Sequence, residues 1–144
     1  RFYQLKIDYY NMNKRFNAIV TALSASAMIA VMVSAMPNDN VISREKDTVI
    51  VNTQELGKNV KGFRGNTPVK IYIHKNKIVK IEAMPNRETP QFFGKAKTLL
   101  DQFNGQTVSK AAKMDVDGVS GATYSSVALK KNVKLGLEYY KKNK

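Results

Sequence analysis

The chain has 144 residues, 43% of them hydrophobic, which suffices for one folded domain with its own core. It has no cysteine and one histidine, His74, which excludes disulfides, thiolate nucleophiles, iron–sulfur clusters and zinc sites built on cysteine or several histidines. The formal net charge of +13 favours anionic partners, although a basic surface that only maintains solubility has the same composition. The lysines are scattered and form no arginine-rich stripe with interleaved aromatic residues, so we expect no nucleic-acid partner.

The N-terminal third is expected to precede the folded domain. Met12 would serve as an initiating methionine, so residues 1–11 are interpreted as an upstream segment that need not be native. Residues 12–35 join a basic start to an uncharged run of Ala, Val, Ile and Met that ends in small residues. This is typical of a signal peptide, but the run is also long enough for a membrane anchor. Both alternatives export the C-terminal remainder of the chain, because the positive residues precede the apolar run. We therefore expect residues 36–47 to be a linker, and residues 48–144 to be a domain in the periplasm or cell envelope, either free or anchored to the inner membrane.

β-Branched and partly alternating runs predict three strands in this domain. They lie at 48–51, 69–74 and 78–84. A short polar link with an asparagine, Lys75-Asn76-Lys77, joins the last two strands and predicts a β-hairpin.

The remaining periodic segments predict helices. Thr89-Pro90 fits a helix start, apolar residues at helical spacing continue over 91–103, and Asn104-Gly105 ends the helix. Residues 108–114 fit either a short helix or an edge strand, and an apolar stripe predicts a final helix over 127–140. The expected fold class is α+β, with a small, mostly antiparallel sheet and helices packed on it.

A polar, glycine-containing stretch, residues 115–126, runs directly into the last predicted helix. It brings backbone N–H groups and several hydroxyls to a helix N-terminus, which favours an anion and phosphate in particular. Ser120, Ser125 and Ser126 would serve equally well as helix caps, which requires no ligand.

Two motifs in the chain resemble those of a known family. Residues 117–123, Asp-Gly-Val-Ser-Gly-Ala-Thr, match the pattern Asp-x-x-Ser/Thr-Gly-Ala-Thr/Ser, and Glu88-Thr89-Pro90 follows the predicted hairpin. Both resemble FMN-binding domains of the RnfG, NqrC and NosR type, and the resemblance covers roughly residues 60–142. In that family a flavin transferase attaches FMN through its phosphate to the final threonine. The resemblance therefore implies FMN as cofactor, held by a phosphoester to Thr123. It also implies further cofactor contacts from Ser120, Gly121, Ala122, Ser125, Ser126, Glu88 and Thr89.

The function implied by this resemblance is that of an exported flavoprotein domain. It would carry electrons in a membrane-associated or periplasmic redox chain, and it fits an electron-transfer domain or subunit better than a stand-alone enzyme. Its partners would be a flavin transferase and redox proteins, with membrane association through the N-terminal segment. A threonine hydroxyl is a weak nucleophile and no His or Cys base stands near it in sequence, which is consistent with modification by a separate enzyme.

Two other classes of function remain as alternatives. A module without flavin could bind a phosphorylated or anionic ligand at the same helix start, and a surface-adhesion domain could use the basic charge. On spacing alone, Glu88 is interpreted as an exposed charge at a helix N-terminus. Of Phe92 and Phe93 we expect one in the core and one against the flavin ring, with Arg87 and Lys113 as candidate cations near that ring.

Overall fold

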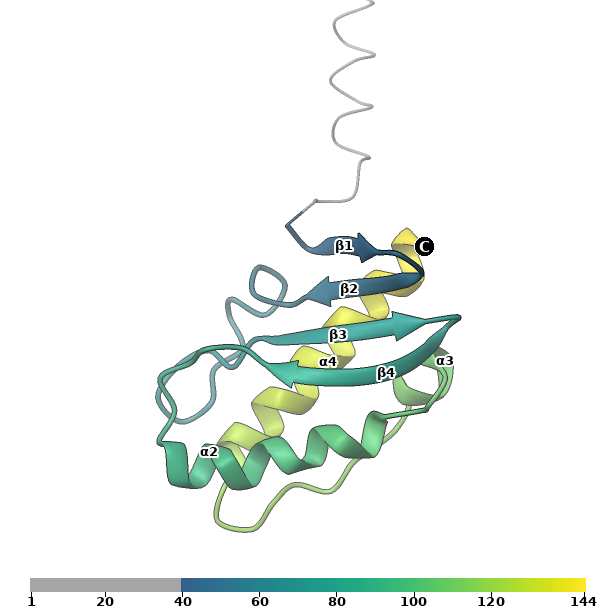
Figure 1. The fold of residues 1–144 in the computed structure, drawn as a ribbon. Coiled ribbons are helices and arrows are strands. Elements are labelled where there is room, and N and C mark those ends of the chain that lie inside the picture. Colours follow the sequence, from purple (N-terminus) through teal and green to yellow (C-terminus); the bar gives the residue numbers. More distant parts are fainter. Residues whose placement is uncertain (1–39) are drawn as a thin grey trace, which may run out of the picture. The chain divides into compact units, whose positions relative to one another are not determined.

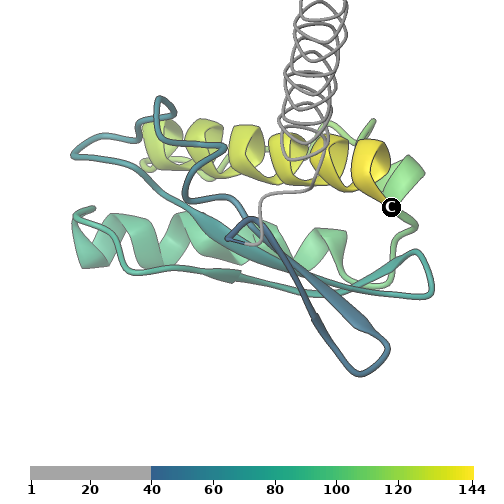
Figure 2. The ribbon, with the colours of Figure 1, turned by 90° about the horizontal axis from the view of Figure 1, so that it is seen from above.

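The computed structural model describes residues 40–144, in which one antiparallel sheet carries helices on one of its faces (Figures 1 and 2). The strand order is β1-β2-β3-β4, so each strand pairs with its neighbour in sequence. The predicted α+β class is confirmed. The predicted leader at residues 12–35 lies outside the described residues, and within residues 40–144 no helix has the length and apolar character needed to cross a bilayer.

The sheet has one strand more than the sequence predicted. Its strands are β1 (Ile42–Glu45), β2 (Thr48–Asn52), β3 (Val69–His74) and β4 (Lys77–Ala83). Strand β1 falls inside the stretch interpreted as a linker, so that part of the prediction is wrong. Its residues 43–45 are exposed and polar, and the strand forms only by pairing with β2. The predicted β3–β4 hairpin is confirmed, with Lys75 and Asn76 in its turn at φ values of 45° and 63°.

The inner face of the sheet is built from residues that alternate along β3. Val69, Ile71 and Ile73 are buried there, as the period of two along a strand requires. Strand β4 departs from this period, because Ile73 pairs with Ile78 whereas Tyr72 pairs with Lys80. The extra residue between these pairs is Val79, which is 53% exposed. This bulge lets Ile78 and Ile81 both face the core although they are three residues apart.

The helices are α2 (Pro90–Ala96), α3 (Val108–Ala111) and α4 (Thr123–Asn143), with a 3₁₀ helix η1 (Lys97–Phe103) that continues α2. The predicted helix over 91–103 is confirmed as helical, but its second half is 3₁₀. The segment that fitted two alternatives forms a short helix, α3. The last helix begins at Thr123, four residues before the predicted start, so the serines after Thr123 belong to its first turn.

Helix α4 packs closely on β2 and β3, and a glycine makes this approach possible. A Cβ atom on Gly136 would lie 2.6 Å from Ile71 Cδ1 and 2.9 Å from Thr53 Cγ2, too close for any larger residue without movement. One turn earlier, the buried Asn132 side chain donates a 3.0 Å hydrogen bond to the Thr67 carbonyl oxygen. These contacts fix where the N-terminus of α4 stands relative to the sheet.

Candidate functional site

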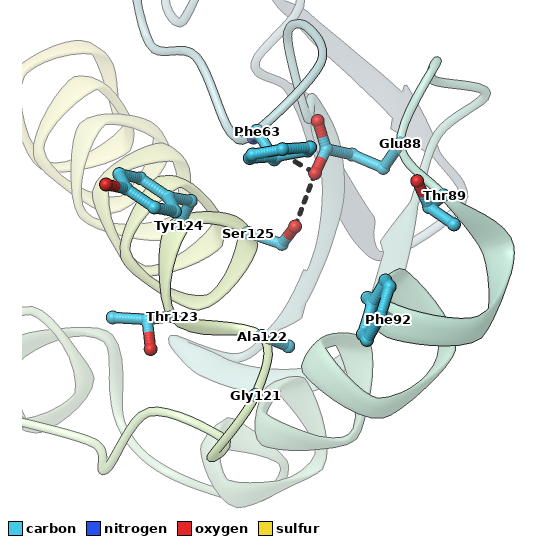
Figure 3. Close-up of a pocket in the computed structure, with 9 residues that line it drawn as sticks. All are labelled: Phe63, Glu88, Thr89, Phe92, Gly121, Ala122, Thr123, Tyr124 and Ser125. Carbon is cyan, nitrogen blue, oxygen red and sulfur yellow. Dashed lines mark hydrogen bonds between the residues drawn. The ribbon is translucent and has the colours of Figure 1, made fainter.

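A cavity of about 250 Å³ lies beside the N-terminus of α4 (Figure 3). Three segments far apart in sequence form it: the loop before β3, the start of α2 and the start of α4. Five large hydrophobic side chains are exposed in the described part of the chain, and three of them line this cavity: Phe63 (69%), Phe92 (46%) and Tyr124 (69%). The rings of Phe63 and Tyr124 lie 6.1 Å apart, centroid to centroid. Exposed rings gathered at one cavity indicate a site for an aromatic ligand. The lining residues are Phe63, Glu88, Thr89, Phe92, Gly121, Ala122, Thr123, Tyr124 and Ser125.

Glu88 is the centre of the hydrogen bonding around this cavity. Its carboxylate accepts backbone N–H bonds from Phe63 (3.1 Å), Arg64 (2.6 Å) and Gly65 (3.1 Å), and a further bond from the Ser125 hydroxyl. A Cβ atom on Gly62 would lie 2.9 Å from the Glu88 carboxyl carbon, so the loop fits around the carboxylate only with glycine there. The carboxylate thereby ties the loop that carries Phe63 to the first turn of α4.

Glu88 is buried, at 7% exposure, so its interpretation as an exposed helix charge is wrong. Burial alone would raise the pKa of its carboxyl group. The hydrogen bonds from Ser125 and from the backbone N–H groups favour the charged form more strongly, and they hold the pKa of Glu88 below its ordinary value. The side chain is therefore a carboxylate at neutral pH, and it acts as an acceptor that organises the loop.

The start of α4 has no side-chain cap. Ala122 is the N-cap residue; its N–H donates to the Val119 carbonyl oxygen, and its own carbonyl oxygen accepts the Ser126 N–H. The three N–H groups between them, at residues 123–125, have no acceptor within the helix and stand at the positive end of its dipole. Gly121 enters this turn at φ +79°, in the left-handed region that favours glycine.

The serines near this turn do not act as caps of α4. The Ser126 hydroxyl is buried and accepts the Val119 N–H at 3.0 Å, which shapes the loop before the helix. The Ser125 hydroxyl donates to Glu88. Ser120 is exposed and outside the cavity lining. The helix start therefore keeps its donors available for an anion.

The structure brings together six of the eight residues that the sequence analysis assigned to the site. Glu88, Thr89, Ser125 and residues 121–123 all line the cavity, whereas Ser120 and Ser126 do not. Of the adjacent phenylalanines, Phe93 is buried in the core, as expected for one of the two. Phe92 lines the cavity, and its contact with the flavin ring stays a prediction.

The candidate cations lie elsewhere. Arg87 lines a different cavity, beside Lys61 and Met84, and Lys113 lines a third one along α4. Phe63 and Tyr124 also line the cavity but were not among the residues predicted for the site. Phe63 stands 25 residues before Glu88, and only the fold brings the two together. Tyr124 directly follows Thr123, so its place beside the motif at residues 117–123 was a sequence feature that could have indicated its role in the site.

An aromatic-lined cavity next to an uncapped helix start defines a binding domain for an aromatic ligand that carries an anionic group. The family model described as FMN-binding domain matches residues 62–138, more than half of the chain. The chain therefore belongs to the FMN-binding domain family, and its cofactor is FMN. The matched range contains every residue that lines the cavity. A search of curated proteins gave no match.

The residues present fit this cofactor. Phe63, Phe92 and Tyr124 line the cavity with aromatic rings suited to a flat heterocycle, and the N–H groups at the start of α4 offer donors to a phosphate. Among the described residues no group of carboxylates and histidine is arranged to hold a metal ion.

Proposed function

We propose that this domain carries FMN covalently, through a phosphoester to the Thr123 hydroxyl, and acts as an electron carrier in a membrane-associated or periplasmic redox chain. The observation that carries the proposal is the position of Thr123. It is exposed at the first helical position of α4 and forms part of the cavity lining that holds the aromatic rings. An enzyme can reach its hydroxyl, and a cofactor attached there has the cavity beside it (Figure 3).

The attachment requires an outside catalyst. The chain has no cysteine, and its one histidine, His74, stands at the β3–β4 turn with its ring at the Asp47 carbonyl oxygen. In the proposed step Thr123 Oγ bonds to the FMN phosphorus of a flavin dinucleotide such as FAD. The bond from that phosphorus to the bridging pyrophosphate oxygen breaks, and AMP leaves with that oxygen. The hydroxyl proton passes to a base of the transferase, because the neutral hydroxyl is a weak nucleophile.

The chain's own residues would then hold the attached group. The phosphodiester keeps one negative charge at the start of α4, where the helix dipole contributes about 0.3–1 kcal/mol. That contribution is too small to retain a cofactor outside the cell, and the covalent bond provides the retention. Bound FMN supplies the capacity to accept and return electrons. Glu88, ionised and fully hydrogen-bonded, positions Phe63 and α4 and does not supply a proton.

The proposed location rests on the sequence of residues 12–35, which lie outside the described residues. The proposed partners follow from the attachment of FMN to Thr123. The uncharged run within residues 12–35, preceded by positive residues, supports export to the periplasm or cell envelope, with or without retention in the inner membrane. The partners would be a flavin transferase and redox proteins that exchange electrons with the ring. The proposal does not assign to the cavity any substrate besides FMN that the domain itself would convert.

The covalent site is tested by co-expression with a flavin transferase and intact-mass measurement. Wild-type protein is expected to be yellow and heavier by one FMN residue, and Thr123→Ala is expected to be colourless at the unmodified mass. The matched control is Thr98→Ala, which changes another exposed threonine hydroxyl, one that bonds only to the Lys95 carbonyl oxygen. This control should carry FMN like the wild type. Covalent flavin on the Thr123→Ala protein would overturn the proposed site.

A further inference from the structure

A second cavity, of about 500 Å³, runs along α4 opposite the segment 111–115, and we call it the lysine groove. Lys113, Lys130, Lys131 and Lys134 lie among its lining residues, and the buried Phe103 and Val133 contribute apolar lining. It shares no lining residue with the aromatic cavity. The groove is therefore a separate surface feature with a basic and partly apolar lining.

Most of the charge in the groove has no counterpart within the domain. In the described range 40–144 the ion pairs are Lys80–Glu82 and Lys130–Asp115, so the other three groove lysines form no ion pair within 4 Å there. The Asp115 side chain is 98% exposed and stands 3.3 Å from Lys130 Nζ, which also donates to the Val116 carbonyl oxygen at 2.7 Å. The groove thus presents a net positive charge that attracts an acidic partner.

The shape and lining of the groove favour a protein segment as this partner. A concave surface with apolar residues fits side chains of a peptide better than a flat bilayer. Single-stranded nucleic acid would need exposed aromatic faces for stacking. The aromatic residue in this lining, Phe103, is 3% exposed. The complementary occupant is a protein segment with acidic and apolar side chains.

The groove begins one helical turn from the proposed modification site. Val127 is among its lining residues and is 42% exposed. It lies four residues after Thr123, so the two side chains project from the same face of α4, about 6 Å apart along its axis. In Figure 3 the Thr123 side chain points away from Phe92 and Glu88. Thr123 lines the aromatic cavity, and the groove begins one turn further along α4, so a protein that approaches the Thr123 hydroxyl along this face of the helix would also cover the groove.

We propose that the lysine groove is the docking surface of the flavin transferase, which contacts it through an acidic segment with apolar side chains. This inference rests on the proposed covalent attachment at Thr123. Docking there holds the transferase beside α4 while Thr123 Oγ bonds to the FMN phosphorus and AMP leaves from the flavin dinucleotide.

The test measures the rate of FMN attachment to the full chain. Purified protein is mixed with a purified flavin transferase, FAD and Mg²⁺, and the FMN mass increment is followed over time at about 50 and 200 mM salt. The triple variant Lys113→Glu/Lys131→Glu/Lys134→Glu is expected to react at least about tenfold more slowly at low salt, with a raised KM and an unchanged kcat. Its rate should also lose most of the salt dependence of the wild type.

Two further variants separate docking from net charge and from misfolding. Lys58→Glu/Lys75→Glu/Lys97→Glu changes three exposed lysines outside the groove by the same charge, and it should react like the wild type. The Lys→Arg triple variant at the groove positions keeps the charge and should also react at the wild-type rate. A groove variant that folds correctly should still reach full FMN loading after long incubation.

The outcomes distinguish this inference from the proposed function. Wild-type protein that gains no FMN mass would overturn both. Wild-type protein that gains FMN at the same rate and KM as the glutamate triple variant would overturn the docking surface alone. An equal slowing of the Lys58, Lys75 and Lys97 variant would also overturn it, because long-range attraction would then account for the effect.

Discussion

The hydroxyl of Ser125, in the first turn of α4, donates a hydrogen bond to the carboxylate of Glu88, which stands 37 residues earlier in the chain. The same carboxylate accepts the N–H groups of Phe63, Arg64 and Gly65. One buried side chain thus connects the loop before β3, the segment before α2 and the start of α4. These are the three segments that line the aromatic cavity.

Replacement of Glu88 by glutamine should destabilise the fold substantially. The amide retains one acceptor but places N–H donors where backbone N–H groups need an oxygen, and it removes the charge that strengthens these bonds. We expect the free energy of unfolding to fall by about 2–4 kcal/mol, measured by urea denaturation. The control is Glu82→Gln, which removes an exposed carboxylate paired with Lys80 and should cost less than about 1 kcal/mol. Equal losses in the two variants would contradict the central role of Glu88.

The stability should depend on acid pH through the same carboxylate. The pKa of Glu88 is lowered in the folded state from the ordinary value of 4.5, so the unfolded chain takes up a proton first as the pH falls. The contribution of the Glu88 carboxylate to the free energy of unfolding is fully present above the unfolded-state value of 4.5. It is lost as the pH falls through the lower pKa of the folded state. The difference in unfolding free energy between wild type and Glu88→Gln should therefore be constant from pH 7 to about 5 and narrow below 4.5. A difference that stays constant down to pH 2 would contradict this assignment.

Local pattern was enough to predict most of the sheet and the last helix. The alternation of Val69, Ile71 and Ile73 and the apolar stripe of α4 are properties of neighbouring residues, and burial follows from them. Strand β1 was missed because Ser43, Arg44 and Glu45 form no apolar alternation and pair only at the sheet edge. The bulge at Val79 was likewise invisible, because it is defined by register against β3.

The site was predictable only in part, for a related reason. The motif at residues 120–123 is continuous in sequence, so its place at a helix start could be predicted from composition. The role of Glu88 could not, because its acceptor function depends on N–H groups 23 to 25 residues away and on a serine in another element. Spacing alone indicated an exposed charge, and tertiary packing overrode that interpretation.

Alanine at Gly121 should affect both stability and the cofactor. Its φ of +79° costs an alanine about 1–2 kcal/mol of folding free energy, while the added Cβ would meet no atom within 4 Å. Gly105 is a matched control, with φ +75° and the same open surroundings at the end of η1. Both variants should lose similar stability in urea denaturation. Only Gly121→Ala should weaken FMN binding, measured by fluorescence titration, because it displaces the turn that presents Ala122 and Thr123. An equal loss of FMN affinity in both variants would contradict this.

The adjacent phenylalanines of α2 should give opposite results when each is replaced by alanine. Phe92 is 46% exposed and lines the aromatic cavity, so Phe92→Ala should leave the unfolding free energy within about 1 kcal/mol of the wild type. It should weaken FMN binding by about 3- to 10-fold, the equivalent of one lost ring contact. Phe93 is buried in the core, and Phe93→Ala should cost about 3–5 kcal/mol of stability through the cavity it leaves.

A third variant supplies the control for this comparison. Val79→Ala trims an exposed hydrophobic side chain on the β4 bulge, outside the aromatic cavity, and should change neither stability nor FMN affinity appreciably. Fluorescence titration with FMN and urea denaturation, applied to all three variants, separate binding from folding. If Phe92→Ala and Val79→Ala bound FMN equally well, the ring of Phe92 would not contact the cofactor. Phe63 and Tyr124 would then be the aromatic residues left to contact FMN in this cavity.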